Sequence, residues 1–386
     1  MGKQTIWKKI ISISMISVLA LSLSGCGGSG EKSSSAAGDG KTAKIGLIDV
    51  LTGNAAVYGK SVQNGVNMAV EEINAKAGDG FKIQVIAEDT GGDKNAAMNA
   101  MNKLVHKDQV VAVIGPLLSG EAFASGGIAQ KAGVAVLGAT LTAEGITDIG
   151  DNVFRTCLPE SQAIPAAVKK AHDAYGFKTA AILYSSNNDQ LVSGYKSFQK
   201  ALDELGVQTI ATETFADKDT DFSAQLTKVE ALHPDVLIVA AHHKEGTLIL
   251  KKAREMGMNM PVIGSNGFNS PVLIQNAGAA AENVIVGSPW FPEKQDDKVQ
   301  TFRKNYKEKY GEDPDQFAAQ GYDAVYMAYK AVQNSGSAVD RKKFAEALRQ
   351  MKDFVGVAGN VQFDDHREPI MDVNVLIVRN GKFEAM

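Results

Sequence analysis

The feature that most constrains the fold is an alternation of short apolar runs with longer segments of helical period, which begins near Lys44. Candidate strands in the first series lie at 44–49, 82–88, 110–114 and 135–137. The same rhythm restarts with candidate strands at 179–184, 208–214, 236–240 and 261–263. Between the strands, segments such as 61–75 carry apolar residues three and four positions apart, which indicates helices. This order is typical of parallel sheets that helices cover on both faces. Two such series predict an α/β protein with two doubly wound, parallel-sheet lobes.

The rest of the chain predicts no third domain. Three helical segments follow the second series, at 298–310, 317–333 and 341–351. Because strand signals are few there, we expect these helices to return to the first lobe. Crossings between the lobes are expected near Pro159, Pro289 and Asp364. Lobe 1 then consists of residues 43–159 plus 290–363, and lobe 2 of residues 160–289 plus 364–386. Ligands of such sheets bind beyond the carboxyl ends of the strands, which predicts a site in the cleft between the lobes.

The first residues have the pattern of a targeting segment. Basic residues precede an apolar stretch at 10–23, which is shorter than the about 20 apolar residues of a membrane-spanning helix. The stretch ends in Leu23-Ser24-Gly25-Cys26, which resembles a lipobox, although a chance cysteine after an ordinary signal peptide is the alternative. We expect a signal peptide at 1–25, a diacylglycerol on Cys26 and a flexible tether at 26–42. The protein is then extracytoplasmic and lipid-anchored to the cell membrane, on its periplasmic side or at the cell surface.

Composition and motifs argue against several other classes of function. The formal net charge is −4 and charges of both signs are interspersed, so no nucleic-acid partner is expected. The segment 53–61 ends like a phosphate-binding P-loop, but five residues separate its glycines where that loop has four. The adjacent His242 and His243 would point apart on an extended segment, which disfavours a shared metal. Cys157 has no disulfide partner if Cys26 is lipidated. We therefore predict that the protein is not an enzyme, has no catalytic residue, and binds no metal and no cofactor.

Four short motifs resemble a known family by their order and spacing. They are Leu51-Thr52-Gly53 followed by Tyr58-Gly59, Ala69-Val70-Glu71-Glu72-Ile73-Asn74, Val113-Ile114-Gly115-Pro116 followed by Ser119, and Gly321-Tyr322-Asp323-Ala324. Together they resemble the leucine/isoleucine/valine-binding family of type I periplasmic binding proteins, over essentially the whole chain after the tether. The resemblance implies a three-crossing hinge between the lobes and a small-molecule ligand in the cleft. It also implies an ABC permease and its ATPase as partners of a monomeric binding protein.

Candidate ligand contacts in the first lobe are Ser119, Ala139, Thr140 and Tyr58. A carboxylate ligand is stabilised at a helix N-terminus, where free amides and the helix dipole favour negative charge. Ser119 lies just before a predicted helix and adds a hydroxyl donor, although simple helix capping is the alternative role. The resemblance implies that Ala139 and Thr140 form the second contact loop and that Tyr58 lines the pocket for the ligand side chain.

The resemblance is less complete in the second lobe. The family's branched-chain amino-acid binders pair the ligand ammonium with an acidic residue, at the position where this sequence has Asn266. An asparagine supplies no charge, and charge-assisted hydrogen bonds are about twice as strong as neutral ones. His242 replaces a family aromatic residue, and Asp189 or Gln190 replaces a tyrosine. Phe268 is expected to shape the remainder of the site.

Two interpretations of the ligand stay open. Asp189 or Glu245 could pair an ammonium in place of the missing acid, and the protein then captures a branched-chain or related hydrophobic amino acid for an ABC importer. Alternatively, the ligand lacks an α-amino group and is a small carboxylate or an amide. A ligand-sensing subunit for a membrane receptor could have the same fold. A hydrolase that uses a serine of the cleft is a further class, which no motif supports.

Overall fold

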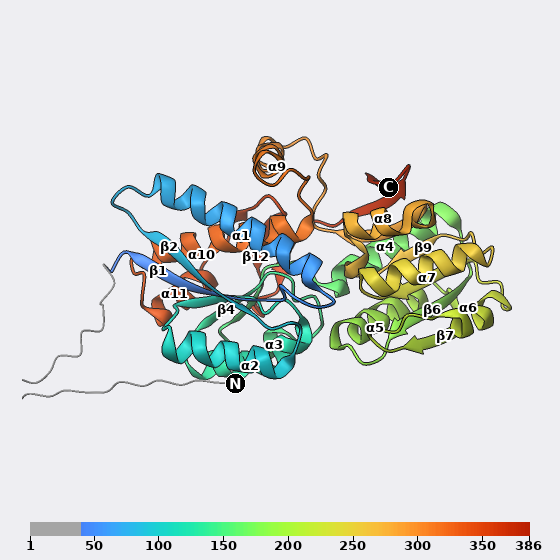
Figure 1. Cartoon of the computed structure of the whole chain (residues 1–386), viewed down its shortest axis with the longest axis horizontal. Helices are drawn as coiled ribbons and strands as arrows, with labels where there is room; N and C mark the ends of the chain where they lie inside the picture. Colours follow the sequence, from blue (N-terminus) through green and yellow to red (C-terminus); the bar gives the residue numbers. More distant parts are fainter. Residues whose placement is uncertain (1–39) are drawn as a thin grey trace, which may run out of the picture. The chain divides into compact units, whose positions relative to one another are not determined.

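The computed structural model describes residues 40–386 (Figure 1). The predicted signal peptide, the predicted lipidation site Cys26 and most of the predicted tether lie outside the described residues. Two sheets, each built mainly of parallel strands, follow one another along the chain. Helices cover both faces of each sheet. We call each sheet with its helices a lobe.

The sheet of lobe 1 has five parallel strands in the order β2-β1-β3-β4-β5. Their bounds are β1 Thr42–Asp49, β2 Lys82–Asp89, β3 Ala112–Ile114, β4 Ala135–Gly138 and β5 Val153–Arg155. The helices are α1 Ala56–Lys76, α10 Gln316–Ser335 and α11 Arg341–Arg349 on one face, and α2 Lys94–Asn102 with α3 Ser119–Lys131 on the other. Because no face is left to solvent, β3 and β4 are buried along their whole length and read as continuous apolar runs.

Helix α10 lies late in the sequence but packs directly along α1 (Figure 1). A Cβ atom at Gly65 of α1 would lie 2.0 Å from the carbonyl oxygen of Ala318, and one at Gly321 of α10 would lie 2.5 Å from that of Val62. Glycine at these two positions therefore allows the two helix backbones to approach closely. The late helices thus complete the core of lobe 1.

The sheet of lobe 2 has seven strands in the order β15-β14-β10-β9-β8-β6-β7. The parallel strands are β6 Thr179–Ser185, β7 Gln208–Phe215, β8 Val236–Ala240, β9 Val262–Gly264 and β10 Val284–Ser288. The antiparallel strands β14 Asn374–Arg379 and β15 Lys382–Ala385 extend one edge. Helices α4 Glu160–Tyr175 and α5 Asp189–Glu204 cover one face, and α6 Ser223–Glu230, α7 His243–Glu255 and α8 Pro271–Ala277 cover the other.

Three connections join the sheets, and small elements lie along the second and the third. The chain passes to lobe 2 between β5 and α4, returns after β10, and crosses again between β13 and β14. Helix α9 Asp297–Tyr310 lies between β10 and α10. A small antiparallel sheet of β11 Phe354–Val355, β12 Asn360–Phe363 and β13 Pro369–Ile370 lies between α11 and β14. Short helical turns lie at Lys103–Lys107, Thr147–Ile149, Asn266–Phe268 and Gly278–Ala281. The predicted crossing point, Asp364, lies between β12 and β13, which pair with each other. The predicted fold class, two doubly wound α/β lobes joined by a three-crossing hinge, is confirmed.

Candidate functional site

A small cavity lies between the lobes, beyond the carboxyl ends of their strands. Both lobes contribute to its wall, through the residues Tyr58, Leu117, Leu118, Thr140, Gln190, His242, Asn266, Gly267 and Phe317. Its volume is about 20 Å³, which is room for roughly one water molecule. A larger ligand can therefore enter only when the two lobes move apart.

The predicted site residues separate into three groups. Tyr58, Thr140, His242 and Asn266 all line the cavity. Ser119 and Ala139 are buried next to it, in the same two segments of lobe 1 as the lining residues Leu118 and Thr140. The remaining two, Asp189 and Phe268, do not line the cavity.

The start of α3 forms the lobe 1 side of the site. Ser119 is the first residue of α3, so it lies within the helix and not before it, as the sequence pattern had indicated. Its Oγ accepts a hydrogen bond from the backbone N–H of Ala143 (3.3 Å), and Oγ1 of Thr140 donates to the carbonyl oxygen of Leu117 (2.6 Å). These two bonds tie the second contact loop to the helix start. The first amides of a helix have no intrahelical acceptor, so this corner can bind a carboxylate.

Glu121 belongs to the same first turn of α3 and affects its charge. Its Oε2 accepts a hydrogen bond from the backbone N–H of Leu118 (3.2 Å). Burial raises the pKa of Glu121 to about 7. Because a carboxyl group with such a pKa is partly protonated near neutral pH, Glu121 repels a bound carboxylate less than an exposed glutamate would.

Tyr58 bridges the two lobes through its hydroxyl group. The hydroxyl donates to the carbonyl oxygen of Gly267 (2.9 Å) and accepts from the backbone N–H of His243 (2.7 Å). Its ring packs against Phe317, with 4.6 Å between the ring centroids, and meets His242 edge-on at 5.9 Å. Burial raises the pKa of Tyr58, so the hydroxyl keeps its proton at neutral pH.

Glu160, which the sequence did not single out, stands behind the lobe 2 wall. Its Oε1 accepts hydrogen bonds from the backbone N–H of Asn266 (3.0 Å) and from Nε2 of Gln190 (3.5 Å). The other end of the Gln190 amide, Oε1, lies 3.5 Å from Nε2 of His242. In the sequence, Glu160 reads as an acid in the first turn of a helix, where it complements the helix dipole. No local signal distinguishes this ordinary role from a place beside a ligand.

Phe268 is a core residue of lobe 2 and not a contact of the cavity. Its side chain is fully buried within the lobe 2 core. A Cβ atom at Gly264 would lie 2.3 Å from Cγ of the ring, and one at Gly246 would lie 2.6 Å from its Cε2. The ring therefore fills the space that these two glycines leave, which draws it away from the cleft.

The two acids considered as ammonium partners, Asp189 and Glu245, already bind other groups of the protein. Asp189 forms an ion pair with Lys94 of lobe 1 at 2.6 Å, and the two side chains are 43% and 57% exposed. Glu245 accepts hydrogen bonds from Nδ2 of Asn54 (3.0 Å) and from the backbone N–H of Lys218 (3.0 Å). None of these residues lines the cavity. The contacts of Asp189 with Lys94 and of Glu245 with Asn54 do, however, join the two lobes in this closed arrangement.

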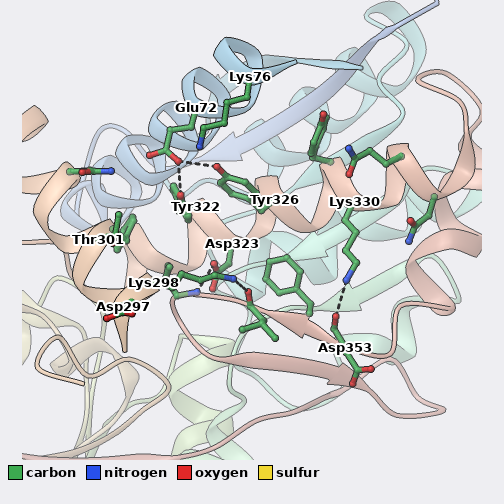
Figure 2. A pocket seen from close by; sticks show the side chains of 18 residues that line it. Glu72, Lys76, Asp297, Lys298, Thr301, Tyr322, Asp323, Tyr326, Lys330 and Asp353 are labelled. Atoms are coloured by element: carbon green, nitrogen blue, oxygen red, sulfur yellow. Dashed lines mark hydrogen bonds between the residues drawn. The ribbon is translucent and has the colours of Figure 1, made fainter. Parts of the chain in front are cut away.

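A much larger hollow, of about 1080 Å³, lies on lobe 1 between α1, α9 and α10 (Figure 2). Two of its carboxylates already have partners. Oε2 of Glu72 accepts hydrogen bonds from the hydroxyls of Tyr322 (2.7 Å) and Tyr326 (2.9 Å). The buried carboxylate of Asp323 likewise accepts the backbone N–H groups of Val357 and Ala358. This hollow is lined by lobe 1 alone, whereas both lobes line the interlobe cavity. We therefore assign the candidate site to the cavity.

Two further features concern the described residues as a whole. In residues 40–386, no helix is both long and apolar enough to cross a membrane. Within the same range, no group of three or more His, Cys, Asp or Glu side chains is arranged to hold a metal ion.

Comparison with known proteins adds independent information. A sequence model of the periplasmic binding protein family matches residues 42–382. The Leu/Ile/Val-binding protein BraC3 of Rhizobium johnstonii is 29% identical over 327 residues, which are 83% of this chain and 87% of that protein.

Solved structures agree with this match. One is the branched-chain amino acid transporter substrate binding protein LivJ of Streptococcus pneumoniae, in complex with isoleucine. It is 31% identical to this chain, with a TM-score of 0.84, and the match covers 89% of this chain and 98% of LivJ. A solute binding protein of an ABC transporter from R. palustris, in complex with benzoate, shares the fold at 23% identity and a TM-score of 0.82, over 89% of this chain and 95% of its own. The chain therefore belongs to the periplasmic binding protein family, as a solute-binding protein of the leucine/isoleucine/valine-binding group.

Proposed function

We propose that the protein captures a branched-chain or related hydrophobic amino acid in the interlobe cavity, for delivery to an ABC permease and its ATPase. The observation that carries the proposal is the juxtaposition of the α3 start, with Ser119 and Thr140, and an apolar wall. The helix start suits a carboxylate, and Leu117, Leu118 and Phe317 suit an aliphatic side chain. The name of the BraC3 relative and the isoleucine bound to LivJ support the same class of ligand.

Lobe closure would couple capture to delivery. A ligand that contacts both lobes favours the closed state over the open one by its difference in affinity for the two states. The closed state would then dock on the permease. Because the cavity has room for about one water molecule, a slightly wider closed state must accompany a bound amino acid.

A thermal-shift screen tests the ligand class. The purified protein is unfolded and refolded to remove carried-over ligand, and then mixed with leucine, isoleucine, valine, 4-methylpentanoate and benzoate. At about 100 times the dissociation constant, a ligand stabilises the folded state by about 2.7 kcal/mol. We expect leucine or its close relatives to stabilise the protein and 4-methylpentanoate, which lacks the amino group, to do so much less.

A second ligand class is favoured by one observation, the asparagine at position 266. Asn266 lines the cavity without supplying a charge for an ammonium. The ligand of the second hypothesis is a small carboxylate or amide without an α-amino group. Stabilisation by 4-methylpentanoate or benzoate but not by leucine would establish this hypothesis and refute the first.

We further propose that the protein is a monomer held outside the cytoplasm by a lipid on Cys26. Support comes from the lipobox-like Leu23-Ser24-Gly25-Cys26 and from the family's export. Cells fed a radioactive fatty acid should label the wild-type protein but not Cys26→Ala. Equal labelling of both proteins would contradict the anchor.

A further inference from the structure

An amino acid brings an ammonium group into a cavity that excludes most water. A buried charge without a partner is strongly unfavourable, so the site needs an anion for this ammonium. Asp189 already forms an ion pair with Lys94, and Glu245 already accepts hydrogen bonds from Asn54 and Lys218. Neither acid therefore meets the requirement from its present position.

Unlike Asp189 and Glu245, Glu160 is hydrogen-bonded to residues that line the cavity. It is the first residue of α4, where the chain enters lobe 2, and it is 1% exposed. Both groups that donate to its Oε1, the backbone N–H of Asn266 and Nε2 of Gln190, belong to residues that line the cavity. Its carboxylate therefore lies directly behind the cavity wall.

The carboxylate of Glu160 is only half satisfied. Its Oε2 is buried and accepts no hydrogen bond within residues 40–386. The buried cation of the preceding segment, Arg155, forms its ion pair with Glu368, at 2.6 Å between Nε and Oε2. Burial raises the pKa of Glu160 to about 7, as expected for an acid that lacks a cationic partner.

We propose that Glu160 supplies the negative charge that pairs the ligand's ammonium, in place of the acid that is absent at position 266. This inference rests on the proposed function, because a ligand without an ammonium needs no such partner. Asn266 and Gln190, which both line the cavity, fix the position of Oε1. The 3.5 Å contact with Gln190 is at the long limit of a hydrogen bond, so the ammonium can replace it at small cost.

Gly194 of α5 gives the carboxylate the space it occupies. A Cβ atom at this position would lie 2.9 Å from Oε2 of Glu160. The backbone N–H of Glu160 also donates to the carbonyl oxygen of Thr142 (3.2 Å), in the segment that follows the contact residue Thr140. The acid is thus fixed between the two lobes, near the loop expected to hold the ligand carboxylate.

The test compares leucine with 4-methylpentanoate, which has the same skeleton without the amino group, by isothermal titration calorimetry near pH 7. Glu160→Gln keeps the shape of the side chain and removes its charge. We expect it to weaken leucine binding about ten- to a hundredfold, and to change 4-methylpentanoate binding by about twofold or less. Glu245→Gln is the matched control, because Glu245 is similarly buried and also has an unpartnered Oε2. Its hydrogen-bond partners, Asn54 and Lys218, do not line the cavity. This control should keep the leucine preference of the wild-type protein.

The outcomes separate the two proposals. A wild-type protein that binds no leucine refutes the proposed function. A leucine preference that is the same in wild type and in Glu160→Gln leaves that function intact and refutes the role of Glu160. Loss of the preference in both glutamine variants also refutes it, because the effect would then not depend on contact with the cavity.

A measurement on the wild-type protein decides the question if Glu160→Gln does not fold. An ammonium beside Glu160 expels the proton that its raised pKa retains, so leucine binding should release protons near pH 7. Heats measured in buffers of different ionisation enthalpy count these protons. The ion pair of Arg155 with Glu368, and the imidazole of His242 beyond Gln190, are the same whichever ligand is bound. Equal proton release with leucine and 4-methylpentanoate would therefore overturn the proposal.

Discussion

Replacing Tyr58 by phenylalanine removes a single oxygen atom from the contact between the lobes. The change breaks two hydrogen bonds, one to the carbonyl oxygen of Gly267 (2.9 Å) and one from the N–H of His243 (2.7 Å). Each bond contributes about 0.5–1.5 kcal/mol, and a buried partner left without a bond costs about 1–3 kcal/mol. In an open state, both backbone groups reach water. We therefore expect the closed state to lose about 2–3 kcal/mol relative to the open state.

This loss should appear in ligand affinity, because the ligand binds in the closed state. We expect Tyr58→Phe to raise the Kd for leucine about 30- to 150-fold in isothermal titration calorimetry. Tyr326→Phe is the control: its hydroxyl donates to Glu72 at 2.9 Å within lobe 1 and joins no second lobe. If the unliganded protein is already mostly closed, part of the loss should instead appear as a larger radius of gyration by small-angle X-ray scattering. Unchanged affinity together with an unchanged radius would refute the role given to Tyr58.

Three further predictions concern single side chains. Ser119→Ala and Thr140→Ala should each weaken leucine binding by about 1.5–3 kcal/mol, which is the contribution of a hydrogen bond to a charged group. Calorimetry measures the affinity, and an unchanged affinity in both variants would contradict the assigned carboxylate site. The folded-state pKa of Glu160, raised from 4.5 to about 7, means that this group favours folding below about pH 4.5 and that this contribution is lost as the pH rises through about 7. The unliganded wild type should therefore lose up to about 3 kcal/mol of stability relative to Glu160→Gln across that range in urea unfolding, and a constant difference would argue against the shift. Burial raises the pKa of the Cys157 thiol to about 12, so thiol reagents should modify it only after unfolding. Mass spectrometry of the peptide that contains Cys157 measures this modification, and rapid modification of the native protein would contradict the burial of the thiol.

Periodic sequence patterns were sufficient to predict the lobes and part of the site. Alternating apolar runs and helical segments depend only on which side chains face a neighbouring layer, which is a local property of each element. They predicted two parallel sheets, and the carboxyl ends of parallel strands always meet at one edge. Family-like motifs then indicated Tyr58, Thr140, His242 and Asn266, which the structure brings together around one cavity. Their roles in binding stay predictions.

The tertiary structure alone decided which side chains near the cleft face it and which do not. Phe268 lies two residues from Asn266 in the sequence, yet it turns into the core because Gly246 and Gly264 leave space there. Asp189 pairs with Lys94, 95 positions away, and Glu160 contacts Asn266, 106 positions away. Such contacts depend on how two lobes close on each other and on which buried groups lack a partner. A linear sequence carries no local pattern for either property, because both are set by packing between segments that are distant along the chain.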